Sequence, residues 1–139
     1  MKRLTKTLIV DDSASVLDIM QAILNDYGIA DVSQAVDGSK AVAQFEEALS
    51  AGSPYALVFL DIVMPRLDGQ EALKRMRAAE KKAKVAPGER ATIIMVTSLH
   101  STDDMMHAII DGDCDDYLVK PFEPAHLLHM LVKYGFRQA

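Results

Sequence analysis

The stretch LIVDDSAS, residues 8–15, sets the interpretation of the whole chain. It is an apolar run that ends in two adjacent carboxylates, Asp11 and Asp12, followed at once by small and hydroxyl residues. A short run that is apolar at every position is typical of a strand buried on both faces of a sheet. Carboxylates resist burial and repel each other, so a pair at the end of such a strand points to a nearby cation.

Four further apolar runs follow, and helical patterns separate them. The predicted strands are residues 7–10, 30–36, 55–61, 91–96 and 116–119. The predicted helices run from Val16 to a stop at Gly28, from Gly38 to a break at 50–54, from Gly69 to Lys81, from Ser101 onward and from Pro124 onward. Strands and helices that alternate in this way predict an α/β fold, with one doubly wound, five-stranded parallel sheet and five helices.

The composition is that of a single soluble domain. The chain has 139 residues, of which 50% are hydrophobic and 25% are charged, and its net charge is -5. This charge argues against nucleic acid as a partner, and no apolar stretch is long enough to cross a membrane. The single cysteine, Cys114, cannot form an internal disulfide. We therefore expect a cytoplasmic protein in a reducing compartment.

Polar side chains follow four of the five predicted strands. They are Asp11 and Asp12, then Asp61, then Thr97 and Ser98, and finally Lys120. In doubly wound sheets ligands bind at the carboxyl ends of the strands, so these side chains are expected to meet. Carboxylates suit a hard cation such as Mg²⁺, while a lysine and a hydroxyl suit an anion, most simply a phosphoryl group.

Each of these residues also has an ordinary structural interpretation. Asp12 or Ser13 could cap the first helix, and Thr97 and Ser98 could form a turn. Taken alone, Lys120 would be a solvated surface lysine. Separate structural roles do not explain why all of these residues stand at successive strand ends, so we favour a binding site.

Four motifs resemble the response-regulator receiver domain, the phospho-acceptor module of two-component signalling. They are LIVDDS (8–13), LVFLDIVMPRLDG (57–69), IIMVTS (93–98) and DDYLVKPF (115–122). The resemblance extends from Leu8 to about Tyr134 and implies the flavodoxin-like topology of receivers.

The resemblance implies a role for each acidic residue. Asp61 would accept a phosphoryl group from a phosphohistidine on a sensor histidine kinase or a histidine phosphotransfer protein. Asp12 would bind Mg²⁺ directly and Asp11 through water, and Asp61 and the backbone carbonyl of Val63 would complete the protein's ligands.

The remaining motif residues would detect the modification. Thr97, Ser98, Lys120 and Tyr117 would be the phosphoryl-contacting and switch residues. Thr97 and Lys120 would bond to phosphoryl oxygens, and Tyr117 matches the aromatic switch position. The Lys120–Pro121 peptide bond is typically cis in this family. The change would reach a partner through the surface of the fourth helix, the fifth strand and the last helix.

The segment GDCDDY, residues 112–117, departs from the family pattern. Receivers usually carry glycine and alanine where this chain has Asp113 and Cys114. Aspartate can adopt the left-handed conformation that such a turn needs, so the fold is not in doubt. The pattern leaves open whether Cys114 is sensitive to oxidation.

A basic stretch runs through the third predicted helix and the loop after it. Its members are Lys74, Arg75, Arg77, Lys81, Lys82 and Lys84. The whole chain is acidic and no DNA-binding motif accompanies the stretch, so we interpret it as a solvated helix face.

We therefore predict a single receiver domain over residues 1–139, with a core of about 7–134, and not an enzyme beyond its own phosphorylation chemistry. Only GFRQA follows the last predicted helix, so the output is expected to be an unidentified protein target or a further phosphotransfer step. The domain would be a monomer or an activation-linked dimer.

Three alternatives remain. The first is a phosphorylation-independent pseudo-receiver, and the second is a Mg²⁺-dependent phosphohydrolase with an aspartyl nucleophile. The third, a flavodoxin-like cofactor binder, lacks a suitable phosphate loop after the first strand.

Overall fold

Strands and helices alternate along the chain as the hydrophobic pattern predicts. The computed structural model describes residues 6–64, 67–98 and 113–137. The strands are β1 (Lys6–Val10), β2 (Asp31–Ala35), β3 (Leu57–Asp61), β4 (Thr92–Ser98) and β5 (Asp116–Lys120). The helices are α1 (Ala14–Asp26), α2 (Gly38–Ser50), α3 (Gly69–Lys82), the short 3₁₀ helix η1 (Pro87–Glu89) and α5 (Pro124–Lys133).

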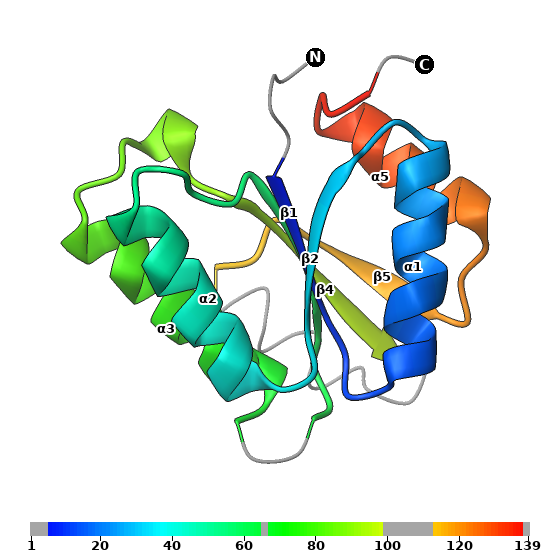
Figure 1. The fold of residues 1–139 in the computed structure, drawn as a ribbon, viewed down its shortest axis with the longest axis horizontal. Coiled ribbons are helices and arrows are strands. Elements are labelled where there is room, and N and C mark those ends of the chain that lie inside the picture. Colours follow the sequence, from blue (N-terminus) through cyan, green and yellow to red (C-terminus); the bar gives the residue numbers. More distant parts are fainter. Residues whose placement is uncertain (1–5, 65–66, 99–112, 138–139) are drawn as a thin grey trace.

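The five strands form one parallel sheet in the order β2-β1-β3-β4-β5. Helices α1 and α5 cover one face of this sheet, and α2 and α3 cover the other (Figure 1). The prediction of a doubly wound, five-stranded parallel fold is confirmed. The helix predicted from Ser101 lies outside the described residues. Among the described helices, none has both the length and the hydropathy that crossing a membrane requires.

Each face of the sheet has its own hydrophobic core. Leu8 and Val58 pack in the cluster beneath α2 and α3, while Ile9 and Phe59 pack in the cluster beneath α1 and α5. All five residues of β3 are buried, which explains why this strand reads as apolar on both sides. Its central position fixes Asp61 at the carboxyl edge of the sheet.

Side-chain caps begin three helices at that same edge. The side chains of Ser13, Asp37 and Asp68 accept hydrogen bonds from the backbone N–H groups of Val16, Lys40 and Glu71. Such caps satisfy N–H groups that have no partner inside the helix. Because Ser13 rather than Asp12 caps α1, the Asp12 carboxylate remains exposed at the edge of the sheet.

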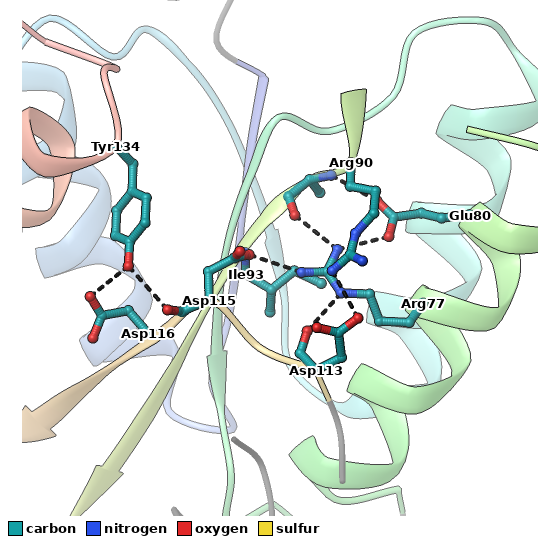
Figure 2. A network of polar contacts seen from close by, with 9 residues as sticks. Arg77, Glu80, Arg90, Ile93, Asp113, Asp115, Asp116 and Tyr134 are labelled. Atoms are coloured by element: carbon teal, nitrogen blue, oxygen red, sulfur yellow. Dashed lines mark hydrogen bonds and ion pairs between the residues drawn. The ribbon is translucent and has the colours of Figure 1, made fainter. Parts of the chain in front are cut away.

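Arg77 corrects the interpretation of the basic stretch. Its side chain is only 10% exposed and lies inside a polar network between α3 and the residues that lead into β4 and β5 (Figure 2). Its guanidinium pairs with Glu80 at 2.7 Å and with Asp115 at 2.9 Å, and it also donates to the carbonyl oxygen of Ala91. The prediction of a solvated basic face is therefore wrong for Arg77.

The turn into β5 has the backbone conformation that aspartate tolerates. Asp113 has a φ of 61°, which lies in the left-handed region that favours glycine. Its carboxylate pairs with Arg90, and its carbonyl oxygen accepts a hydrogen bond from Arg77. The structure thus accounts for the departure from glycine at this position.

Candidate functional site

Three carboxylates meet where β1 and β3 end. Asp11 and Asp12 follow β1, and Asp61 is the last residue of the neighbouring β3. Each of the three contributes an oxygen, and these oxygens lie within 4.8 Å of one another. The side chains of Asp11 and Asp61 are only 3% and 8% exposed, whereas Asp12 faces solvent. Two of the three acids are thus largely removed from water.

Lys120 brings a positive charge to this cluster from the end of β5. Its Nζ donates to Oδ2 of Asp11 at 2.8 Å and to Oδ2 of Asp61 at 3.4 Å. Burial alone would lower the pKa of Lys120, but the hydrogen bond to Asp11 and the charge of Asp61 raise it. The alternative of a solvated surface lysine is therefore excluded. The peptide bond from Lys120 to Pro121 is cis.

The pKa of Asp61 lies above the ordinary value of an aspartate. Burial raises its pKa to about 6, and the nearby Asp11 adds to the rise, while Lys120 opposes it. The backbone N–H of Val63 donates to Oδ1 of Asp61 at 3.3 Å and orients the carboxylate. A partly buried oxygen nucleophile beside an ammonium group can attack an electrophile whose negative charge that ammonium neutralises.

The hydroxyl residues lie at the end of β4, between the ends of β3 and β5. Thr97 is buried, and its hydroxyl donates to the carbonyl oxygen of Ser98 at 3.3 Å. Ser98 is exposed and pairs in register with Lys120. Tyr117 lies three residues before Lys120 on β5 and is partly exposed.

The support of Asp11 is a feature that the sequence analysis missed. Oδ1 of Asp11 accepts a hydrogen bond from the backbone N–H of Ser13 at 2.9 Å, while Oδ2 contacts Lys120. The signal was present, because an aspartate two residues before a helix cap commonly bonds to the backbone in this way. Both oxygens of this buried carboxylate therefore have a partner.

The donor set fits a hard divalent cation. Opposite ligands of one Mg²⁺ lie about 4.2 Å apart, close to the 4.8 Å within which the oxygens of Asp11, Asp12 and Asp61 gather. The exposure of Asp12 leaves room for the water ligands that Mg²⁺ retains. Among the residues that the structure describes, this cluster consists of carboxylates alone, without the histidine and cysteine that softer metals prefer.

Comparisons with known proteins identify the family of this chain. The family model described as "Response regulator receiver domain" matches residues 7–132. The chain is 33% identical over 128 residues to the chemotaxis protein CheY of Listeria monocytogenes. This alignment covers 92% of the chain and 96% of CheY. It is 37% identical over 125 residues to probable histidine kinase 2 of Oryza sativa, with 84% of this chain aligned, but it spans only 11% of that protein.

Solved receiver structures have the same fold. The receiver domain of Ssk1 from Saccharomyces cerevisiae, in a co-crystal with the histidine phosphotransfer protein Ypd1, superposes with a TM-score of 0.79 at 30% identity, covering 99% of this chain and 94% of that one. The receiver of the histidine kinase CKI1 from Arabidopsis thaliana, complexed with Mg²⁺ and BeF₃⁻, superposes with a TM-score of 0.78 at 26% identity. This superposition covers 94% of this chain and 90% of that one. The fold, the strand-end residues and these matches together show that the chain belongs to the response regulator receiver domain family.

Proposed function

We propose that Asp61 accepts a phosphoryl group from a phosphohistidine on a sensor histidine kinase or a histidine phosphotransfer protein. The observation that carries the proposal is the position of Asp61, largely buried beside Asp11, Asp12 and Lys120. A carboxylate oxygen of Asp61 attacks phosphorus, a P–O bond forms, and the P–N bond to the donor imidazole breaks. The co-crystal of Ypd1 with the Ssk1 receiver supports this class of donor.

Asp11, Asp12, Asp61 and the backbone carbonyl of Val63 are the proposed protein ligands of Mg²⁺. When bound, Mg²⁺ would neutralise the charge that gathers on the transferring phosphoryl oxygens. Lys120 already contacts the carboxylate of Asp61, so a phosphoryl group on Asp61 would carry its anionic oxygens next to this ammonium group. The Mg²⁺ and BeF₃⁻ complex of the CKI1 receiver supports such a site.

Thr97 and Tyr117 are the proposed switch residues. A phosphoryl group on Asp61 adds anionic oxygens that can accept a hydrogen bond from the buried Thr97 hydroxyl. Movement of Thr97 alters the end of β4, next to β5 and its partly exposed Tyr117. The surface that includes β5 and α5 then presents a different shape to a protein target in the cytoplasm.

Intact-protein mass spectrometry after incubation with acetyl phosphate tests the proposal. Wild type should gain one phosphoryl group in Mg²⁺ and none in EDTA, and Asp61→Asn should gain none. Asp18→Asn is the matched control, since it removes an exposed carboxylate on α1 and should be phosphorylated like wild type. A folded wild type that binds Mg²⁺ without any mass gain would instead identify a phosphorylation-independent interaction module.

A further inference from the structure

Two glycines abut the backbone that carries Asp61. We name Asp61–Met64 and Leu67–Gly69 the acceptor turn, because these residues surround the proposed acceptor. A Cβ atom built on Gly38, the first residue of α2, would lie 2.1 Å from the carbonyl oxygen of Leu67. A Cβ atom on Gly69, the first residue of α3, would lie 2.1 Å from the carbonyl oxygen of Asp61. Both distances are far below van der Waals contact.

Neither neighbour can give way cheaply. The atoms approached are backbone atoms, and real Cβ atoms essentially never come closer than 3.0 Å to such an atom, so an alanine at either position must displace backbone by about 1 Å. Leu67 packs against the buried cluster beneath α2 and α3. The N–H of Gly69 donates to the carbonyl oxygen of Ile62 at 2.9 Å, which ties the two ends of the turn together.

The N-terminus of α2 is also fixed independently. Asp37 is buried and caps the helix, and the side chains of Ala41 and Phe45 lie in the core. The beginning of α2 lies beside the link from β3 to α3 at the lower edge of the sheet in Figure 1. Displacement caused by a side chain at Gly38 would therefore be taken up by the acceptor turn rather than by the helix.

We infer that Gly38 and Gly69 are positioning residues for phosphoryl acceptance, because their lack of side chains lets α2 and α3 fix the backbone of the acceptor turn. The inference rests on the proposed function of Asp61. The turn sets the Asp61 carboxylate through the N–H of Val63, and it carries the carbonyl of Val63 that would face the cation. A shift of the turn would separate both groups from Asp11 and Asp12.

The test compares Gly38→Ala with Gly88→Ala. Gly88 lies in η1, and a Cβ atom there meets nothing within 4 Å, so this control makes the same change in open space. Phosphorylation by acetyl phosphate is followed by intact mass at saturating Mg²⁺, and Mg²⁺ affinity and urea unfolding are measured on the same samples. Ile29→Ala, which leaves a cavity in the other core, serves as a control for lost stability.

We expect Gly38→Ala to be phosphorylated at least about tenfold more slowly than Gly88→Ala, because a displacement of ~1 Å can cost ~100-fold in rate. Ile29→Ala should keep the wild-type rate at an equal folded fraction. If Gly38→Ala unfolds in buffer, the comparison is made in concentrated sucrose, which favours the compact state. Gly69→Ala, tested in parallel, should show the same defect.

Two results would overturn the inference. Equal rates for folded Gly38→Ala and Gly88→Ala, with wild type phosphorylated normally, would remove the positioning role and leave the proposed function intact. Wild type that gains no phosphoryl group would remove the proposed function itself, and the positioning role with it.

Discussion

Asp61 carries its carboxylate in a place that disfavours ionisation. Its pKa in the folded, metal-free protein is about 6, against an ordinary value of 3.8. Between these values the unfolded chain has lost the proton while the folded chain keeps it, so stability falls as the pH rises from about 4 to about 6. We expect metal-free Asp61→Asn to be more stable than wild type by about 1–3 kcal/mol near pH 7.5, and to lose this advantage below about pH 4.

Urea unfolding in EDTA at the two pH values measures this difference. Asp18→Asn removes a negative charge from an exposed site and should leave the free energy of unfolding almost unchanged at both pH values. An Asp61→Asn protein that is no more stable than wild type near neutral pH would show that burial does not penalise the Asp61 charge.

Cys114 is held in its unreactive form. The thiol is half-buried, and burial together with the neighbouring Asp115 raises its pKa to about 11. Only the thiolate reacts with electrophiles, and little thiolate exists at neutral pH. We expect iodoacetamide to alkylate the folded protein at least about tenfold more slowly than the urea-unfolded chain. Mass spectrometry reports this site alone because the chain has one cysteine, and equal rates would restore the idea of a redox-sensitive position.

At the scale of elements, the network around Arg77 joins α3 to two strands whose other ends enter the site. Glu80 accepts a hydrogen bond from the N–H of Ala91 at 2.7 Å, and Asp115 accepts one from the N–H of Ile93 at 2.8 Å (Figure 2). Arg77 pairs with both carboxylates. The network therefore holds the beginnings of β4 and β5, and Thr97 and Lys120 lie at the far ends of these strands.

Replacing Arg77 should cost far more stability than replacing Arg75 on the same helix. Arg77→Met leaves the Glu80 carboxylate buried without its cation, so we expect a loss of about 3–5 kcal/mol. The Arg75 side chain is 56% exposed in its pair with Glu71, so Arg75→Met should change the free energy of unfolding by less than about 1 kcal/mol. Urea unfolding of both variants measures the contrast. Similar small losses would mean that the network contributes little.

At the scale of the whole molecule, the local hydrophobic pattern was enough to predict the parallel sheet and the edge at which the site lies. β3 is apolar on both sides because it lies at the centre of the sheet, and a parallel sheet gathers its strand ends at one edge. The first residue of β3 was predicted to be Tyr55, but the strand begins two residues later, at Leu57. Tyr55 precedes the strand, and its ring stacks on that of Phe45.

Contacts between elements that are distant in the sequence could not be predicted from it. Glu80 lies only three residues from Arg77, but the other carboxylate that pairs with Arg77, Asp115, is 38 residues away, so the sequence does not show that a buried network forms there. The hydrogen bond from Lys120 to Asp11 joins residues 109 positions apart. Lys120 therefore neutralises part of the negative charge of Asp11 and Asp12, which the sequence analysis had assigned to a metal ion alone. The close approach of Gly38 to Leu67 likewise depends on how two helices pack.

Cation binding should couple to the stability of the whole molecule, because a ligand that binds only the folded state stabilises it by mass action. At a Mg²⁺ concentration 100 times the dissociation constant the gain is about 2.7 kcal/mol, which raises Tm by several degrees in a domain of this size. Asp12 is the exposed member of the acidic cluster, so Asp12→Asn should fold normally and lose most of this rise. Thermal unfolding of both proteins in Mg²⁺ and in EDTA measures the effect. An equal rise in Asp12→Asn would mean that Mg²⁺ acts elsewhere on this acidic chain.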